Sequence, residues 1–311
     1  MSRNALYSRV MFARRGVGRL LVATVVAGLA LPLAGASSSA ASTKKASGTV
    51  NVLYAGSFHD LMELHLGPAF HKATGYTVSG ISAGSSALAS EISGKTVVGD
   101  VFISASPTVN ASLEGASNGN WVSSYREFGF SPLVLGYYAK SKFAKDLQTR
   151  SWYDVVDLPG FLLGRTDPAT DPKGVLAVDA LEGTALTHDI PALNALATSK
   201  SNVFEETALV GQLQAGQLDA GFFYGVEAAA AHLKTVPLKG TALSGQYTVA
   251  ILNRAPHRAA AKAFVAFLLS KAGRSILNKY GVKPIMSPVV TKASSTRSTT
   301  STTSVTARTS P

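Results

Sequence analysis

The sequence predicts an α/β protein with two lobes, each built on a doubly wound, mainly parallel sheet, and a ligand cleft between the lobes. Between about Ser47 and Pro288, apolar runs of strand length alternate with helical patterns, as expected for parallel α/β units. A long β-rich run at Pro132–Ala139 and a later one at Gly245–Asn253 provide two segments that cross between the lobes.

The first lobe begins with three units of one kind, each a buried strand followed by a short turn and a helix or helix start. The strands are predicted at Thr49–Tyr54, Tyr76–Ile81 and Asp100–Ala105. A helix is expected from about Phe58 and another over Ala87–Ser93, and Pro107 opens the segment after the third strand.

The second lobe continues the same rhythm. A strand and loop in "FLLGRTDPATDPKG" precede a helix over about Val175–Leu186, and "ALVGQLQAGQLDAGFFYGVEAAAA" is typical of helix, strand, turn and helix. A long helical segment at Pro256–Gly281 closes the fold. We therefore expect lobe 1 at residues 48–132 and 245–288, and lobe 2 at residues 133–244.

Both ends of the chain differ in composition from this region. Arginines precede an apolar run at Leu20–Leu33, and Ala34-Gly35-Ala36 then offers a cleavage site, so residues 1–41 are predicted to be a signal peptide and 42–47 a linker. An uncleaved anchor is the alternative, although the run is shorter than the roughly 20 residues that span a bilayer. Residues 289–311 are rich in Ser and Thr and are expected to be disordered.

The absence of cysteine excludes disulfides and a lipid-modified cysteine. We expect an exported protein, in the periplasm or on the outer face of the cell envelope, that is not a lipoprotein.

The formal charge of +11 does not indicate nucleic-acid binding. Of 29 basic residues, five lie in the predicted signal peptide, two in the linker and three in the tail, which leaves 19 against the 18 acidic residues of the chain. The folded part is therefore nearly neutral, and we expect no nucleic-acid partner.

Two similar turns follow the first two predicted strands. Ser57 follows Gly56 in "YAGSF", and Ser85 and Ser86 follow Gly84 in "SAGSS". Free N–H groups and partial positive charge at a helix start suit an anion. Simple N-capping by serine is the alternative for either turn alone. Because the two turns come from adjacent strands, together they favour a shared oxyanion site. A P-loop sequence is absent.

Five short segments in this order, "YAGSF", "SAGSSALASEISGK", "DVFISA", "GRTDPATDPKG" and "LDAGFFYGVEA", resemble the extracellular solute-binding proteins of molybdate and tungstate ABC importers. The resemblance covers about Val50–Pro288. It implies a type II periplasmic-binding-protein fold that closes on a tetrahedral oxyanion and delivers it to ABC permease subunits. It also implies a monomer without a cofactor, whose ligand is molybdate or tungstate.

The same resemblance suggests which groups bind the oxyanion. The hydroxyls of Ser57 and Ser85 would hold it from lobe 1, with Ser86 as a supporting helix cap. From lobe 2 it implies the hydroxyl of Tyr224 and backbone amides at or near Lys173 and near Glu206. No free metal cation and no positive side chain is required, and we expect a dissociation constant in the micromolar range or tighter.

Asp171 departs from a simple anion site. It resembles an aspartate of archaeal-type binders that, with a glutamate, extends metal coordination toward six ligands, but here Phe223 stands at the glutamate's position and Glu227 lies a helical turn beyond Tyr224. A four-oxygen anion held by hydrogen bonds is therefore expected. Two unit charges 4 Å apart repel by about 4 kcal/mol at an effective dielectric of about 20. Asp171 is therefore protonated, coordinates the metal centre, accepts a proton from a ligand such as hydrogenphosphate, or merely caps the next helix.

Three other functions remain to be compared. A hydrolase would need Ser57, His59 and Asp60 to converge, but neighbours on a helix point in different directions and the Gly-x-Ser-x-Gly elbow is absent. A metal-ion site at His59, His65 and His71 lacks the spacing of three or four residues that places histidines on one face. Sulfate, thiosulfate or phosphate remains open as ligand, because hydroxyls and amides do not distinguish tetrahedral anions.

Overall fold

The computed structural model describes residues 46–285 and 290–292, all within one unit of the chain. The predicted signal peptide, most of the linker and most of the Ser/Thr-rich tail lie outside the described residues. No helix in the described ranges combines the length and the apolar character needed to cross a membrane.

Eleven strands of the described ranges join into one sheet. They are β1 (Thr49–Ala55), β2 (Thr77–Ala83), β3 (Val101–Ser104), β4 (Val122–Tyr137), β5 (Leu163–Thr166), β6 (Val203–Phe204), β7 (Ala220–Tyr224), β8 (Lys234–Pro237), β9 (Ser244–Leu252), β10 (Lys283–Pro284) and β11 (Val290–Lys292).

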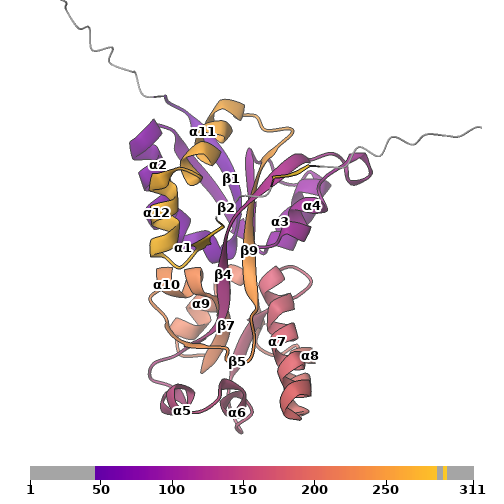
Figure 1. The fold of residues 1–311 in the computed structure, drawn as a ribbon, viewed down its shortest axis with the longest axis vertical. Coiled ribbons are helices and arrows are strands. Elements are labelled where there is room, and N and C mark those ends of the chain that lie inside the picture. Colours follow the sequence, from indigo (N-terminus) through magenta and orange to yellow (C-terminus); the bar gives the residue numbers. More distant parts are fainter. Residues whose placement is uncertain (1–45, 286–289, 293–311) are drawn as a thin grey trace, which may run out of the picture. The chain divides into compact units, whose positions relative to one another are not determined.

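The helices flank this sheet (Figure 1). Those before β4 are η1 (Gly56–Phe58), α1 (His59–Leu61), the π-helical η2 (Met62–Leu66), α2 (Gly67–Thr74), α3 (Ser85–Gly94), α4 (Pro107–Ala111) and η3 (Ala116–Asn118). Those after it are α5 (Ala144–Thr149), α6 (Trp152–Val156), α7 (Pro172–His188), α8 (Ala192–Thr198), α9 (Glu206–Gln214), α10 (Gly225–Ala230), α11 (Arg258–Leu268) and α12 (Lys271–Lys279).

The strand order is β2-β1-β3-β9-β4-β7-β5-β6, with β8, β10 and β11 also paired to β4. The strands that alternate with helices pair in parallel, as expected: β1 with β2 and β3, and β5 with β6 and β7. The central strands β4 and β9 pair antiparallel with each other and with their neighbours, so the sheet as a whole is mixed. Strand β4 leads from the part built on β1, β2 and β3 to the part built on β5, β6 and β7, and β9 returns, so the two strands run in opposite directions.

Strand β4 changes partner along its length. Residues Val122–Pro132 pair with β9, whereas Leu133–Tyr137 pair with β7. We call the part built on β1, β2, β3 and β9 lobe 1 and the part built on β5, β6 and β7 lobe 2; Figure 1 shows β4 and β9 running between them. The partner of β4 changes between Pro132 and Leu133, and the lobe limits remain a prediction.

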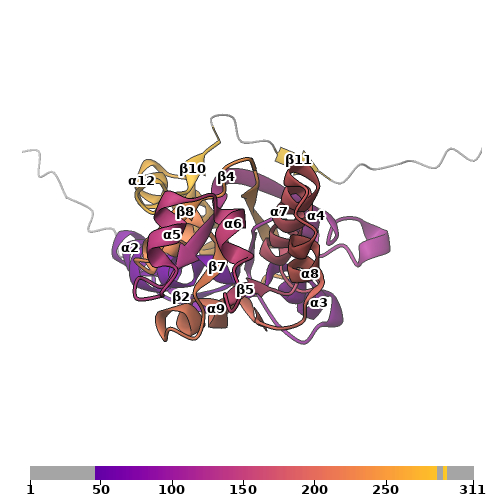
Figure 2. The ribbon, with the colours of Figure 1, turned by 90° about the horizontal axis from the view of Figure 1, so that it is seen from below.

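Buried apolar side chains cover both faces of the lobe 1 sheet. Along β1, Val50, Val52 and Tyr54 belong to the large core that also extends into lobe 2, and Leu53 belongs to a second core with Leu88 and Phe102. A strand buried on both faces is typical of α/β folds. In lobe 2, α7 packs beside α8 (Figure 2).

Three elements differ from the sequence predictions. Strand β4 begins at Val122, ten residues before the predicted start, because polar residues of its first half are tolerated in a strand held by backbone pairing to β9. The long C-terminal helix is two helices, α11 and α12, the second capped by Ser270 Oγ, which accepts from Gly273 N at 3.2 Å. The expectation of disorder from residue 289 is wrong for Val290–Lys292, which pair with β4; backbone hydrogen bonds form irrespective of a Ser/Thr-rich composition.

Candidate functional site

The ends of four strands and the start of one helix meet in a single buried region. Ser57 follows β1 and Ser85 follows β2, while lobe 2 provides Asp171 and Lys173 after β5, Tyr224 at the end of β7 and Glu206 at the start of α9. All six predicted residues are at most 2% exposed. The contacts described below connect five of them in one cluster with Tyr247 and Glu227, which were not predicted, and the turn that carries Ser85 touches the turn before α7.

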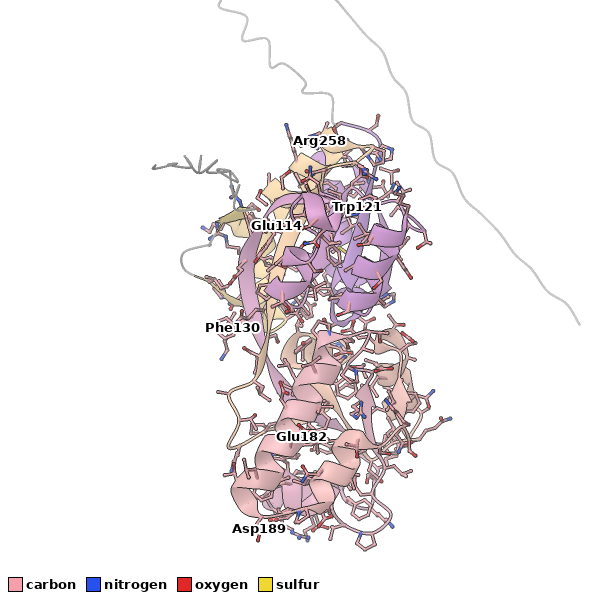
Figure 3. The ribbon with its side chains drawn as sticks, turned by 90° about the vertical axis from the view of Figure 1, so that its right-hand side faces the viewer. Glu114, Trp121, Phe130, Glu182, Asp189 and Arg258 are labelled. Carbon is pink, nitrogen blue, oxygen red and sulfur yellow. The ribbon has the colours of Figure 1, made fainter. Side chains whose placement is uncertain are left out.

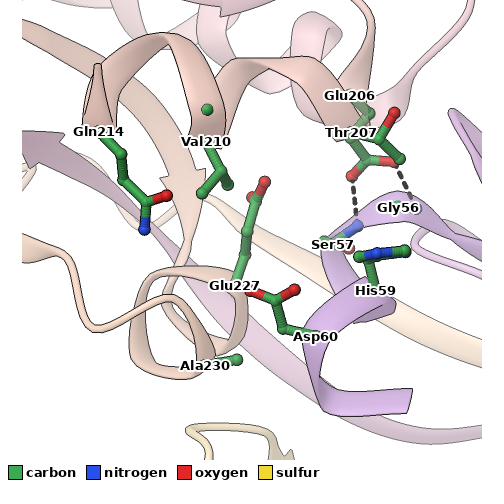
Figure 4. A pocket seen from close by; sticks show the side chains of 11 residues that line it. Gly56, Ser57, His59, Asp60, Glu206, Thr207, Val210, Gln214, Glu227 and Ala230 are labelled. Carbon is green, nitrogen blue, oxygen red and sulfur yellow. Dashed lines mark hydrogen bonds between the residues drawn. The ribbon is translucent and has the colours of Figure 1, made fainter. Parts of the chain in front are cut away.

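The carboxyl group of Glu206 spans the two lobes. Its Oε2 accepts a hydrogen bond from Gly56 N at 2.6 Å, and its Oε1 accepts one from Ser57 N at 2.9 Å (Figure 4). These amides open η1, where the backbone N–H groups lack helical partners. A Cβ on residue 56 would lie 2.7 Å from Oε2, so this approach requires glycine at position 56.

Lys173 brings a buried ammonium group into the cluster. Its Nζ donates to Glu227 Oε2 at 2.6 Å and lies 3.6 Å from Glu206 Oε1. Burial opposes the charged ammonium, but Glu227 and Glu206 outweigh it and raise the pKa of Lys173 above its usual value. The positive side chain that the sequence reading considered unnecessary is therefore present, and the predicted role of the Lys173 backbone amide needs correction, because that amide donates to Asp171 Oδ1 at 3.1 Å.

Asp171 caps α7 and lies in the same buried region. Oδ1 accepts from Lys173 N in N-cap geometry, as one sequence alternative expected. Oδ2 is buried and has no hydrogen-bond partner among the described residues. Burial raises the pKa of Asp171, and the neighbouring Lys173 opposes this rise.

Four hydroxyl groups lie in the same region. Ser57 Oγ and Tyr247 Oη are 3.0 Å apart and share a hydrogen bond, and the rings of Tyr224 and Tyr247 meet edge to face at 5.9 Å. Tyr224 Oη is buried without a hydrogen-bond partner within the described part of the chain. Ser85 Oγ accepts from Ala105 N at 3.1 Å, which leaves its proton free to be donated.

The turn before α3 touches the turn before α7. Ala87 N donates to Thr170 O at 3.0 Å, and a Cβ on Gly84 would lie 2.3 Å from that same oxygen. Gly84, not a serine, is the N-cap of α3, which has no side-chain cap hydrogen bond. The prediction that Ser86 caps this helix is wrong, because the helix already begins at Ser85.

A pocket of about 150 Å³ opens beside the cluster. Ser57 and Glu206 line it together with Glu227, His59 and Asp60, and Figure 4 shows Glu206 hydrogen-bonded at the turn that carries Gly56 and Ser57. The other predicted residues are not among those that line the pocket.

The structure does not assemble either rival site. Ser57 Oγ pairs with Tyr247, whereas His59 Nδ1 lies 3.0 Å from Ser82 Oγ, so Ser57 and His59 do not form a nucleophile–base pair. His65 stacks on Tyr280 and His71 Nδ1 lies 3.1 Å from Tyr76 O. Within residues 46–285 and 290–292, no group of three or more His, Cys, Asp or Glu is placed to hold a metal ion.

Sequence reasoning missed Tyr247, Glu227 as an ion-pair partner, and the Lys173 ammonium. Tyr247 lies within strand β9, where the sequence pattern predicts a buried core residue. Lys173 and Glu227 are 54 residues apart in sequence, and only packing brings them together. Their types and spacing carried no signal for a buried ion pair.

The arrangement suits hydrogen bonding to a small polar ligand. Tyr224, Ser85 and one member of the Ser57–Tyr247 pair each retain a hydroxyl proton to donate. Burial raises the pKa values of Tyr224 and Tyr247 well above their usual range, so both remain neutral donors. Burial likewise raises the pKa values of Glu206 and Glu227.

Comparison with known proteins places the chain in a family. The model of the family described as bacterial extracellular solute-binding protein matches residues 50–283. An uncharacterized solute-binding protein of Halobacterium salinarum is 28% identical over 252 residues, covering 72% of this chain and 81% of that protein. The molybdate/tungstate-binding protein WtpA of Pyrococcus abyssi is 23% identical over 212 residues, which cover 51% of this chain and 62% of WtpA.

The fold agrees with this assignment. The periplasmic molybdate-binding protein of Azotobacter vinelandii superposes with a TM-score of 0.58 at 20% identity, over 75% of this chain and 98% of that chain. This likeness supports the two-lobed type II periplasmic-binding-protein fold. From the family match and the fold together, this chain belongs to the bacterial extracellular solute-binding proteins.

Proposed function

We propose that this protein binds a tetrahedral oxyanion, molybdate or tungstate, in the buried cluster between its lobes and delivers it to the permease subunits of an ABC transporter. The observation that carries the proposal is Tyr224 Oη, a buried hydroxyl without a hydrogen-bond partner among the described residues, on a ring that packs against Tyr247. Buried polar groups are nearly always hydrogen-bonded, so this group calls for a ligand acceptor. The ligand names of WtpA and of the Azotobacter protein support this choice of anion.

The proposed ligand contacts come from both lobes. Ser57 and Ser85 donate hydroxyl protons from lobe 1, and Tyr224 donates from lobe 2. The Lys173 ammonium supplies positive charge at the cluster, and Asp171 Oδ2 is a buried acceptor without a partner among the described residues. We propose that a backbone amide near Glu206, at the start of α9, is a further donor to the anion.

This arrangement implies capture and release without a chemical step. The donors are neutral hydroxyls and amides held by the fold, and the ligand leaves when the lobes separate. We propose that the protein acts as an exported monomer and catalyses no reaction.

Isothermal titration of the purified protein with sodium molybdate, tungstate, sulfate and phosphate tests the proposal. We expect dissociation constants for molybdate and tungstate in the micromolar range or tighter, equivalent to about 8 kcal/mol or more, and weaker binding of sulfate. Absence of binding heat with both molybdate and tungstate, supported by unchanged melting temperatures in their presence, contradicts the choice of ligand.

Hydrogenphosphate is a second candidate, favoured by Asp171 Oδ2. This unpartnered oxygen can accept the proton that hydrogenphosphate carries and that molybdate and tungstate lack at neutral pH. An Asp171→Asn variant keeps an oxygen that can cap α7 while removing the charge. If hydrogenphosphate is the ligand, this variant loses phosphate affinity at least tenfold; if molybdate is the ligand, it binds molybdate as well as or better than the wild type.

Asp179→Asn is the matched control, because Asp179 is an exposed residue of the same helix. Unchanged affinity of Asp171→Asn for molybdate, tungstate and phosphate would show that Asp171 only caps the helix.

A further inference from the structure

The groups best suited to bind an anion on lobe 1 are already bound by a side chain of lobe 2. Gly56 N and Ser57 N, the first amides of η1, donate to the two separate oxygens of Glu206 at 2.6 and 2.9 Å. Two neighbouring amides that hold two oxygens of one anionic group form the contact that a tetrahedral oxyanion would make at this turn.

Glu206 is held in this position from several sides. It is 2% exposed, and its Oε1 lies 3.6 Å from Lys173 Nζ. The turn at residues 56 and 57 accommodates the carboxyl group because residue 56 is glycine; a Cβ there would lie 2.7 Å from Oε2. The Glu206 carboxyl group is therefore buried in a position defined by hydrogen bonds and close packing, not exposed on the protein surface.

The surrounding charges make simultaneous occupancy by a dianion unfavourable. Asp171, Glu206 and Glu227 supply three carboxyl groups around one ammonium, that of Lys173, and all four side chains are buried. Two unit charges at about 4 Å repel by roughly 4 kcal/mol at an effective dielectric of about 20. An oxyanion that uses the amides of Gly56 and Ser57 must consequently displace the Glu206 carboxylate.

We propose that Glu206 is a built-in competitor for the oxyanion: its carboxylate occupies the lobe 1 amides, holds the two lobes together without ligand, and lowers the affinity for the transported anion. This inference deepens the proposed function. The predicted effect on anion affinity rests on that function, whereas the predicted lobe contact without ligand does not. Such a residue limits the affinity for the anion and favours its release, because the Glu206 carboxylate again binds the amides of Gly56 and Ser57 as the anion leaves.

The first experiment measures lobe closure without any ligand. The chain has no cysteine, so Glu91→Cys on α3 and Glu182→Cys on α7, both exposed positions, accept spin labels specifically; Figure 3 labels Glu182 on lobe 2. Distances between the labels are measured by pulsed electron paramagnetic resonance. We expect Glu206→Gln to shift the distribution of label distances to longer values, because the glutamine NH₂ group cannot accept a hydrogen bond from the second backbone amide.

Two further variants make this test specific. Glu205→Gln alters the adjacent, exposed glutamate and should leave the distribution unchanged. Gly56→Ala leaves Glu206 intact but places a Cβ against its carboxyl group, and it should reproduce the Glu206→Gln shift. Wild-type distances in both Glu206→Gln and Gly56→Ala overturn the lobe-holding role.

The second experiment titrates the same proteins with sodium molybdate. Glu206→Gln should bind at least tenfold more tightly than the wild type, and Glu205→Gln should bind as the wild type does. Equal or weaker binding by a folded Glu206→Gln, as judged by its circular dichroism and melting temperature, overturns the competition.

The two experiments separate this inference from the proposed function. If Glu206→Gln opens the lobes but no variant binds molybdate, the holding role stands and the ligand assignment fails. If molybdate binds and neither closure nor affinity changes in Glu206→Gln, the oxyanion function stands and the competition fails.

Discussion

At the scale of single residues, the site is defined by polar groups whose hydrogen-bonding capacity is not fully used. Tyr224 Oη and Asp171 Oδ2 are buried and unpartnered within the described ranges. A buried polar atom without a partner costs about 1–3 kcal/mol. A fold that retains two such atoms in one cluster carries that penalty where a ligand can relieve it.

Replacement of Tyr224 by Phe should therefore separate binding from stability. We expect molybdate affinity to fall about tenfold, or about 1.4 kcal/mol, since one hydrogen bond to a charged ligand is lost. The ligand-free protein should be as stable as the wild type or more stable by about 1 kcal/mol, because the variant removes an unsatisfied hydroxyl. Titration calorimetry and urea unfolding measure the two effects.

Tyr153→Phe is the control for this substitution. Tyr153 is a partly buried tyrosine of lobe 2 that stacks on His188 of α7. The Tyr153→Phe variant should bind molybdate as the wild type does. Wild-type affinity in Tyr224→Phe would show that its hydroxyl does not contact the ligand.

The sequence indicated the residue types of the site but not their contacts. Ser57 and Ser85 were proposed because each follows a predicted strand in a Gly/Ser turn, and Tyr224 was proposed from the resemblance; their binding of the anion stays a prediction. The Lys173–Glu227 ion pair was not predictable, since it joins α7 and α10 across the buried interior of lobe 2. Favourable Coulomb energy there depends on a distance that no local pattern encodes.

At the scale of elements, the contact between the α3 and α7 turns decides how close the lobes come. Gly84 and Thr170 meet with backbone against backbone. Unlike a flexible side-chain end, a carbonyl oxygen in a turn cannot rotate out of the way. Close approach of these elements therefore depends on the missing side chain at position 84.

Gly84→Ala should weaken ligand binding without preventing folding. Its Cβ would lie 2.3 Å from Thr170 O, so we expect the lobes to be held apart and molybdate affinity to fall at least tenfold. The backbone of Gly84 has φ −55° and ψ 135°, which alanine adopts without strain. Spin-label distances and calorimetry on the same variant measure closure and binding.

Gly183→Ala provides the comparison. No atom outside its own helix backbone would lie within 4 Å of the added Cβ, and alanine favours a helix over glycine by about 1 kcal/mol. This variant should bind as the wild type does and be slightly more stable. If both glycine variants bind normally, the turn contact does not control closure.

Most elements followed from local patterns, and the exceptions have physical causes. Strands β1 and β3 are rich in apolar residues because they are largely buried among helices. The expectation of a buried strand is wrong for β2, whose residues are all exposed or half-buried. Strand β4 was predicted only in part, because Arg126 and Glu127 interrupt its apolar run while its backbone remains paired with β9. The backbone pairing of β11 likewise has no signature in side-chain composition.

At the scale of the whole molecule, ionisable groups are concentrated at the boundary between the lobes. Burial raises the pKa values of Asp171, Glu206 and Glu227 in the folded protein. An acid with a raised folded pKa stabilises the fold fully below its unfolded pKa and loses this contribution as pH rises through the folded pKa. The raised pKa of Lys173 acts at higher pH, above its ordinary value of 10.5.

The ligand-free protein should therefore become less stable as pH rises above about 4.5, the ordinary pKa of glutamate. Urea unfolding at a series of pH values from 5 to 8 measures this trend. Glu206→Gln should reduce the slope by up to about 1.4 kcal/mol per pH unit within the range where Glu206 titrates.

Glu205→Gln again serves as the reference, since it removes an exposed carboxylate from the same helix start. A wild-type and a Glu206→Gln protein with identical pH dependence would show that Glu206 has the same proton affinity in the folded and unfolded states.

The sequence by itself determined the α/β class, the order of most elements, the Gly/Ser turns after β1 and β2 and the resemblance to solute-binding proteins, because each depends on residues close together in the chain. Only the tertiary structure decided that the Glu206 carboxyl group holds the amides of Gly56 and Ser57, that Lys173 is a buried cation and that Tyr247 joins the site. These features arise between residues about 50 to 190 positions apart. Their energies depend on burial and distance, which exist only once the two lobes have packed together.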